Sequence, residues 1–292
     1  MNNEPKISYK EISILAEKLL KTSITHYDET CDKYFPMSQK DQETVHFSEE
    51  LISIHQHPIY RKLDEYKKIR LSQLELINFF SLTIHGEDFL IKNMTAYLTL
   101  IDDEIVRKYL KLFIDEEHHH SFWFQKFCDS TPHSFDKNHN FSLDQRSSGT
   151  NSHKDFLIFL IKVYLFEQLS MIYNKILSKD PTLPPLIRSI NQQHLIEEGR
   201  HVLFGITMIE HLYKNLIPIY PSLVEELSFQ TRSFGQILFH NFFNQDIYKK
   251  CQLDQPFKVK KELSSHAKYH DWFNLLLKKS SRELIKRNII QL

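Results

Sequence analysis

The stretch FIDEEHHHSF, residues 113–122, places three acidic residues directly before three histidines. It contains three overlapping acid-x-x-His pairs, which are Asp115/His118, Glu116/His119 and Glu117/His120. Residues three apart lie on the same side of a helix, so each pair suits either a metal site or a solvated helix face. The spacing alone does not decide between them, because a metal site needs further ligands from elsewhere in the chain.

The overall composition favours long helices. The chain has 292 residues, of which only 5 are glycine, and this scarcity argues against a turn-rich β architecture. Lysine plus arginine and aspartate plus glutamate both number 37, so no net charge recruits nucleic acid or an anionic membrane, and we expect neither as a partner. The 3 cysteines are far apart, which excludes a disulfide framework. No segment is typical of a signal peptide or a membrane span, and we therefore expect a cytoplasmic protein.

Four long apolar-periodic segments form the centre of the chain. They cover about residues 71–100, 102–128, 155–178 and 183–214, and a polar connection of residues 130–155 separates the second from the third. Four helices with one long crossover have the connectivity of a ferritin-like bundle. We expect an all-α, ferritin-like four-helix bundle with additional N- and C-terminal helices. The expected single domain, 1–292, consists of an N-terminal arm (1–60), a metal-binding core (70–215) and accessory helices (222–292).

The fourth segment contains the histidines and the acid that a second half-site requires. In HLIEEGRHVLF, residues 194–204, His194, Glu198 and His201 stand at i, i+4 and i+7 and share one helix stripe. The apolar residues of the same helix continue this stripe, so it is the buried face. Buried ionisable side chains need partners, because an unpaired buried charge is costly.

The first and third segments each supply one further buried acid. Glu167 is the only acid between residues 156 and 179, an otherwise apolar helix. The first segment offers Glu75, Glu87 and Asp88. We choose Glu87, because it shares its face with apolar residues, whereas Asp88 shares a face with polar and charged ones.

The chain therefore presents a lone Glu and then an acid-x-x-His pair, twice in succession. This is the inward-facing ligand set of di-iron carboxylate bundles, in which four carboxylates offset two divalent cations. Oxygen and imidazole ligands suit iron, and manganese as well. For the second helix we choose Glu116/His119, because this register matches EEGRH and lies over Tyr109, Leu112, Phe113 and Trp123. Glu117/His120 also has an apolar face and remains the alternative.

These residues resemble the p-aminobenzoate N-oxygenase (AurF-like) family of di-iron oxygenases. The resemblance covers roughly residues 70–215, and its most specific element is the third histidine in HLIEEGRH. It implies two iron ions, O2 and an external electron donor, supplied by a separate reductase or ferredoxin. It also implies N-oxygenation of an arylamine to hydroxylamine and nitro products. We expect a small-molecule amine, free or carrier-linked, as the substrate. The metal ligands carried over are Glu87, Glu116, His119, Glu167, His194, Glu198 and His201. We also consider a homodimer as the assembly.

The expected substrate pocket is apolar and lacks an arginine. No basic residue lies one or two turns before Glu87, and Asn174 is the nearest polar anchor after Glu167. The expected pocket residues are Phe80, Thr83, Tyr164, Met171 and Asn174. Without a cation for a carboxylate, the substrate need not be a free aminobenzoate. Two rival functions remain: a carbon hydroxylase with the same cofactor, and a non-catalytic ferritin-like protein that handles iron or scavenges peroxide.

Overall fold

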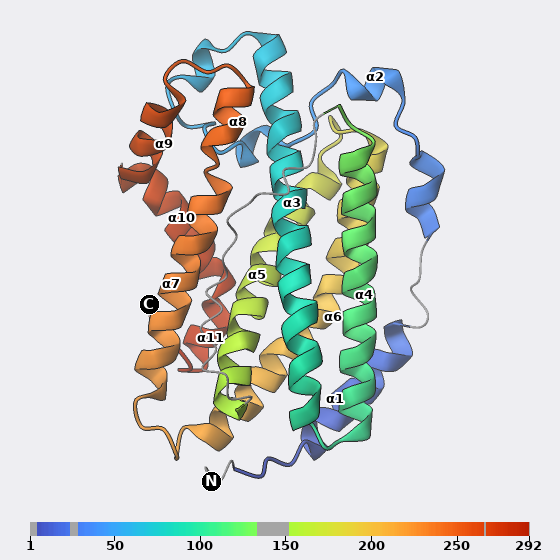
Figure 1. The fold of residues 1–292 in the computed structure, drawn as a ribbon, viewed down its shortest axis with the longest axis vertical. Helices are drawn as coiled ribbons and strands as arrows, with labels where there is room; N and C mark the ends of the chain where they lie inside the picture. Colours follow the sequence, from blue (N-terminus) through green and yellow to red (C-terminus); the bar gives the residue numbers. More distant parts are fainter. Residues whose placement is uncertain (1–4, 24–28, 133–151, 266, 292) are drawn as a thin grey trace.

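A computed structural model describes residues 5–23, 29–132, 152–265 and 267–291. The described chain is all helical, and four long helices run side by side as a bundle (Figure 1). The prediction of an all-α, ferritin-like bundle with additional helices at both ends is therefore confirmed. Most of the predicted crossover between the second and third core helices, residues 133–151, lies outside the described residues.

The four core helices are α3 (Glu65–Tyr97), α4 (Glu104–Asp129), α5 (His153–Lys179) and α6 (Pro185–Leu216). α3 begins six residues before the expected start at residue 71, because the side chain of Asp64 accepts a hydrogen bond from the backbone N–H of Lys67 (2.8 Å) and caps the helix there. Asp103 caps α4 and Ser152 caps α5 in the same way. Proline at its first position starts α6.

The N-terminal segments cover one side and one end of the bundle. They comprise α1 (Lys10–Ser23), η1 (Glu29–Tyr34), α2 (Gln39–Gln42), η2 (Glu49–Leu51) and η3 (Tyr60–Lys62). α1 packs across α4 and α6 at one end, and η1 packs on α6 (Figure 1). In the same arm, the ring of Phe35 stacks on Trp123 of α4, with centroids 5.8 Å apart. The outer side of α4 is therefore partly buried, although it faces away from the bundle centre.

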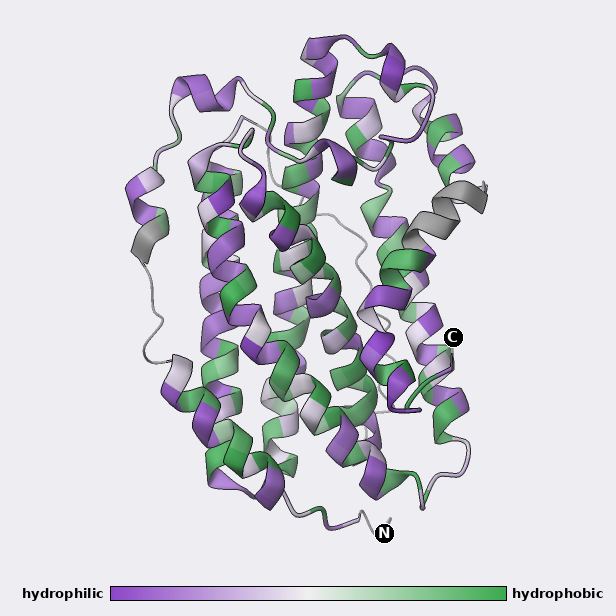
Figure 2. Ribbon diagram, turned by 180° about the vertical axis from the view of Figure 1, so that it is seen from behind, coloured by the Kyte–Doolittle hydropathy of each residue, from purple (hydrophilic) through white to green (hydrophobic). Residues whose placement is uncertain are grey.

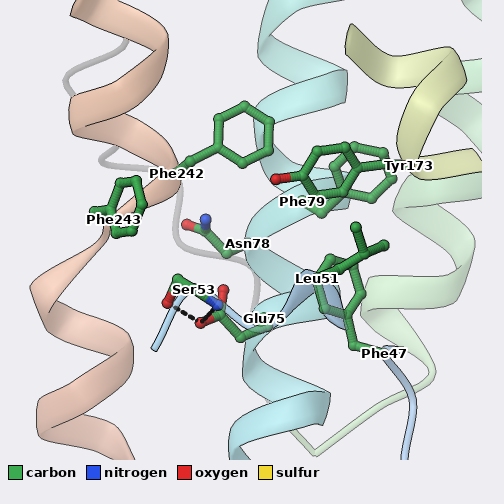
Figure 3. A pocket seen from close by; sticks show the side chains of 9 residues that line it. All are labelled: Phe47, Leu51, Ser53, Glu75, Asn78, Phe79, Tyr173, Phe242 and Phe243. Atoms are coloured by element: carbon green, nitrogen blue, oxygen red, sulfur yellow. Dashed lines mark hydrogen bonds between the residues drawn. The ribbon is translucent and has the colours of Figure 1, made fainter. Parts of the chain in front are cut away.

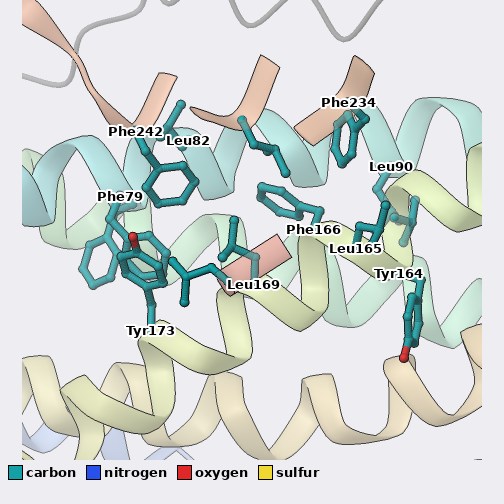
Figure 4. Packing of buried hydrophobic residues seen from close by; sticks show 14 of the residues in the cluster. Phe79, Leu82, Leu90, Tyr164, Leu165, Phe166, Leu169, Tyr173, Phe234 and Phe242 are labelled. Carbon is teal, nitrogen blue, oxygen red and sulfur yellow. The ribbon is translucent and has the colours of Figure 1, made fainter. Parts of the chain in front are cut away.

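The C-terminal helices lie against α3 and α5. α7 (Leu223–Phe242) runs along this flank, followed by α8 (Gln245–Lys250), α9 (Pro256–Ser265), α10 (Ala267–Ser280) and α11 (Arg282–Lys286) (Figure 1). A short 3-10 turn, η4 (Leu98–Leu100), leads from α3 toward α4. Figure 4 shows aromatic and aliphatic side chains of α3, α5 and α7 interdigitating, including Phe79, Phe166 and Phe234. The apolar core thus extends beyond the four-helix bundle.

α5 is the central apolar helix of the structure. It is the one described helix that is long and apolar enough to cross a membrane, but 72% of its most apolar stretch is buried inside the bundle. The high hydropathy of α5 is explained by its buried position, since a helix that is apolar on all sides fits the centre of a protein. In Figure 2 hydrophilic residues are mostly on outward-facing turns, in keeping with this arrangement.

Gly86 allows α3 and α5 to approach closely beside Glu87. A Cβ atom on Gly86 would overlap the ring of Phe166, which lies against this turn of α3. We therefore expect Gly86→Ala to lower the free energy of unfolding by about 1–3 kcal/mol, the usual cost of overpacking a core. Urea unfolding of the metal-free protein measures this effect.

Gly199 provides the matched control for this substitution. It is an exposed glycine of α6, and a Cβ there meets no atom within 4 Å. Gly199→Ala should stabilise the protein by about 0.5–1 kcal/mol, because alanine loses less backbone entropy in a helix. Equal stability of the two variants would contradict the proposed close contact with Phe166.

Candidate metal centre

Seven buried side chains of four helices converge at the middle of the bundle. They form three groups, and within each group the ligand atoms lie within 4.8 Å of one another. The groups are Glu87, His120 and His194; Glu117, Glu198 and His201; and Glu167, His194 and Glu198. α3 contributes one residue, α4 two, α5 one and α6 three. None of the seven is more than 3% exposed. We refer to them below as the carboxylate–histidine cluster.

Two glutamates occupy the middle of the carboxylate–histidine cluster. Oε1 of Glu198 lies 2.9 Å from Nε2 of His194 and 3.3 Å from Nδ1 of His120, and Oε2 lies 3.4 Å from Nδ1 of His201. Glu117 lies between two histidines as well, with Oε1 2.8 Å from Nδ1 of His201 and Oε2 3.3 Å from Nδ1 of His120. Each of these carboxylates therefore lies between histidines of α4 and α6.

Several of these inward-facing atoms make no hydrogen bond within the described residues. They are Oε1 of Glu87, Glu117 and Glu167, both carboxylate oxygens of Glu198, Nε2 of His194 and Nδ1 of His201. Buried polar atoms are normally hydrogen-bonded, and each exception requires an explanation. A set of carboxylate oxygens and imidazole nitrogens that point at one another fits a site for cations with oxygen and nitrogen ligands, such as iron or manganese.

The pKa shifts of the cluster glutamates also favour a cation site. Burial raises the pKa of Glu87 to about 7, and the charge of Glu117 adds to the rise. Burial, together with Glu198 and Glu117, raises the pKa of Glu167 well above its ordinary value. For Glu198, burial acts in the same direction, but His194 and His201 outweigh it and hold its pKa well below the ordinary value. Crowded buried carboxylates repel one another unless a cation offsets their charge.

On α4 the structure brings Glu117 and His120 into the cluster, not Glu116 and His119. His119 is exposed, and Glu116 is directed to the outer side of His201. The helix face chosen from the sequence was therefore the wrong one. Of the apolar residues used for that choice, Tyr109 and Phe113 pack inside the bundle against α6, whereas Trp123 is partly buried by Phe35 of the N-terminal arm. The other five expected ligands, Glu87, Glu167, His194, Glu198 and His201, do meet in the cluster.

Two glutamates form crossed hydrogen bonds between α4 and α6 outside the cluster. Glu116 of α4 bonds His201 of α6 (Oε2 to Nε2, 2.7 Å), and Glu197 of α6 bonds His120 of α4 (Oε2 to Nε2, 2.6 Å). Each glutamate directly precedes one of the cluster glutamates, Glu117 or Glu198. Partners of this kind orient a metal-binding histidine and fix which ring nitrogen faces the metal. Here they leave Nδ1 of both histidines directed inward.

Other side chains support this outer layer. Arg200 donates to Oε1 of Glu116 (2.6 Å), and Gln193 donates to Oε1 of Glu197 (2.5 Å). Asn174 lies in hydrogen-bond contact with Nδ1 of His194, and Ser121 donates to Oε2 of Glu87. Glu197, Arg200 and Ser121 were not predicted from the sequence as part of this layer. Glu197 and Arg200 flank Glu198 in EEGRH, so the motif itself contains the signal, but their partners on α4 are visible only in the folded chain.

The five residues expected to form a substrate pocket lie on α3 and α5. Phe80 packs on Phe124 with ring centroids 4.5 Å apart, and Thr83 donates to the backbone carbonyl of Phe79. Tyr164 extends toward α6 (Figure 4), and Met171 is half-buried. Asn174 contacts a cluster histidine, as described above. A substrate site formed by these five residues therefore remains a prediction.

The fold and the site together define a ferritin-like helical bundle that encloses a buried carboxylate–histidine cluster. The family of p-aminobenzoate N-oxygenase AurF matches residues 10–279, and the chain belongs to this family. The match covers the N-terminal arm and most of the accessory helices in addition to the core. No curated protein was found that matches the chain.

Proposed function

We propose that this protein is a di-iron, O2-dependent oxygenase that transfers oxygen to the nitrogen of an amine. The observation that carries the proposal is the convergence of seven buried ligand-type side chains, several of whose inward atoms make no hydrogen bond within the described chain. Membership of the p-aminobenzoate N-oxygenase family supports this reaction type. Conversion of an amine to a hydroxylamine consumes one O2, two electrons and two protons, and releases one water.

The side chains divide naturally between two metal positions. Glu87, His120 and His194 would hold one ion, and Glu117, Glu198 and His201 the other. Glu167 lies with His194 and Glu198 and completes the set of four carboxylates and three imidazoles. Reduced iron bound there would supply the activation of O2. The electrons come from a separate donor protein, and we expect the reaction to take place in the cytoplasm.

The surrounding residues keep the site rigid and dry. The ring of Phe113 stacks on His201, with centroids 3.7 Å apart, and Phe124 meets His194 edge-on at 4.9 Å. Both phenylalanines are buried. Apolar walls exclude bulk water, and this strengthens the electrostatic interactions within the site and protects reactive species. The hydrogen bonds of Glu116 and Glu197 hold the imidazoles in the orientation that metal binding requires.

The proposal is tested by iron content and by the identity of the product. Protein reconstituted anaerobically with Fe(II) should contain about two irons per chain, in line with the ligand count of di-iron bundles. After chemical reduction it should convert an arylamine to a product that carries one ¹⁸O from ¹⁸O2 on nitrogen, detected by mass spectrometry. Zinc-loaded protein serves as the control, because zinc has no redox chemistry.

The outcomes separate the rival functions. A product labelled on carbon would show that the protein is a carbon hydroxylase, and its assignment as a di-iron oxygenase would stand. Turnover of peroxide without any labelled organic product would identify a scavenging protein. An iron content well below one per chain after reconstitution would contradict the di-iron assignment itself.

A further inference from the structure

His194 differs from the other two histidines of the carboxylate–histidine cluster in how its ring is oriented. His120 and His201 direct Nδ1 inward, and each is held at Nε2 by a glutamate of the facing helix. In His194 the order is reversed, because Nε2 lies 2.9 Å from Oε1 of Glu198 and Nδ1 contacts Asn174. The third imidazole therefore has an outer partner of a different kind, an amide in place of a carboxylate.

Asn174 is fully buried, and one atom of its amide has no partner. It follows Glu167 by two helical turns on the same stripe of α5, which packs along α6 (Figure 1). Its Nδ2 donates to Nδ1 of His194 and to Oγ of Ser170, the latter over 3.2 Å. Oδ1 makes no hydrogen bond within the described residues, although the side chain is 0% exposed. A buried acceptor without a donor requires an explanation.

Metal binding at His194 creates a need for an acceptor at Nδ1. Nε2 is the ring nitrogen that faces the cluster, with Oε1 of Glu198 at 2.9 Å and Oε1 of Glu87 at 3.6 Å. A histidine binds a metal as the neutral imidazole, through the nitrogen that carries no hydrogen. When Nε2 is the ligand atom, Nδ1 therefore carries the ring hydrogen and has to donate it. The Nδ2 group of an amide cannot accept this hydrogen, but Oδ1 can.

The unpartnered Oδ1 of Asn174 can take this position. The terminal torsion of asparagine is broad and roughly two-fold, so a half-turn of the amide exchanges Oδ1 and Nδ2 while the rest of the side chain stays in place. Oδ1 then has lone pairs for the Nδ1 hydrogen of His194 and for the hydroxyl of Ser170. Aromatic rings lie on other sides of His194, since Phe124 and His120 meet it edge-on at 4.9 and 4.4 Å between centroids. The amide is thus the acceptor that the fold supplies at Nδ1.

We propose that Asn174 is the positioning residue of the third histidine, and that its Oδ1 accepts the Nδ1 hydrogen of His194 when Nε2 binds a metal ion. A carboxylate partner raises the basicity of a metal-binding imidazole, whereas a neutral amide fixes the ring without adding charge. His194 is therefore the weakest of the three imidazole ligands. This role differs from that of a substrate anchor, which the sequence predicts for Asn174. It rests on the metal centre of the proposed function but not on the identity of the substrate.

The test measures the binding of Co(II) to the metal-free full chain, without any substrate. Asn174→Leu keeps the branched shape of the side chain but can neither donate nor accept, and should bind Co(II) about tenfold more weakly at one of the two metal positions, the low end of the usual loss for an outer partner. Asn174→Asp restores an acceptor and adds charge, and should bind about tenfold more tightly than the unmodified chain. Asn191→Leu is the matched control, because Asn191 is a fully buried asparagine of α6 that donates to the carbonyl of Ile187 (2.7 Å). It should leave the affinity unchanged.

Proton NMR of the Co(II) protein reports the ring hydrogen of His194 directly. Each of the three metal-binding imidazoles keeps one ring N–H, so three exchangeable, paramagnetically shifted signals should appear in water and disappear in D2O. Asn174→Leu should remove or shift one of them and leave the two whose hydrogens are held by Glu116 and Glu197. Asn191→Leu should keep all three. A general loosening of the core would instead affect the three signals alike.

The outcomes separate this proposal from the proposed function. If the unmodified chain bound no Co(II), the metal centre would be contradicted, and the role of Asn174 with it. If the unmodified chain bound two ions and Asn174→Leu matched Asn191→Leu in affinity and in all three signals, the role of Asn174 alone would be overturned and the metal centre would stand. Should Asn174→Leu not fold, Asn174→Asp decides the matter. Weaker Co(II) binding by Asn174→Asp than by the unmodified chain would overturn the proposal, since an ionised carboxylate is a stronger acceptor than an amide.

Discussion

His120→Ala and Glu117→Ala should each lose iron and abolish amine oxidation, whereas His119→Ala should retain both. Glu117 and His120 are buried with their ligand atoms facing the other members of the cluster, whereas His119 is exposed on the other side of α4. Loss of an outer partner alone typically costs 10–100-fold in metal affinity. We expect at least about hundredfold weaker iron binding for either ligand variant. Iron titration of the metal-free protein measures it.

Glu116→Ala distinguishes a ligand from an outer partner within the same test. Because Glu116 bonds the outer nitrogen of His201 rather than facing the cluster, its loss should weaken iron binding by about 10–100-fold without abolishing it. His118→Ala, at another exposed position of α4, controls for removal of a histidine as such. If His119→Ala proved more damaging than His120→Ala, the register seen in the structure would be wrong.

Glu198→Ala should have the largest effect of any single substitution, with both irons lost together. Its two oxygens face three histidines, His120, His194 and His201, and no other carboxylate of the cluster contacts all three. Removal of a residue at the edge of the cluster, such as Glu87, should instead weaken iron binding at one metal position more than at the other. Iron content of the variants after anaerobic reconstitution, with circular dichroism to verify helix content, measures the difference.

A stepwise loss would contradict this central role. If Glu198→Ala retained one iron per chain while Glu87→Ala retained none, Glu87 and not Glu198 would connect the two positions. Glu198→Gln provides the matched control for shape, because it keeps the volume and one carbonyl oxygen but not the charge. It should also lose iron, since the neutral amide removes one of the four negative charges that would offset two divalent cations.

The helices and most of the cluster were predictable because they depend on local spacing. His194, Glu198 and His201 stand at i, i+4 and i+7, so any helix through these residues brings them to one face. Glu167 is a single acid in an apolar helix, and its burial follows directly. The ferritin-like connectivity follows from the lengths of the four apolar-periodic segments.

The register of α4 was not predictable from spacing, because two faces of that helix carry apolar residues. One of them faces the bundle and the other contacts the N-terminal arm, through Phe35 and Trp123. A sequence period shows that a face is buried but not what buries it. The site therefore required the tertiary contacts of an arm that is distant in sequence from α4.

A small pocket lined by Glu75, Ser53 and Phe242 (Figure 3) was not predicted for a related reason. Glu75 was visible as an acid on the first core helix, but its partner Ser53 belongs to an irregular segment and Phe242 to the end of α7. No periodicity connects these three positions. In the same way, Tyr164 shares a helix with Glu167 but extends toward α6.

The crossed hydrogen bonds of Glu116 and Glu197 have a consequence for how the proposed di-iron site would acquire its metal. Each bond joins α4 to α6, so neither helix can slide along the other without breaking both bonds. An arriving ion therefore meets imidazoles that are already turned inward, and little ordering entropy remains to be lost. Metal capture should then proceed at a rate set by the entry of the ion rather than by refolding of the bundle. Apoprotein made before iron is plentiful would remain competent to be charged later.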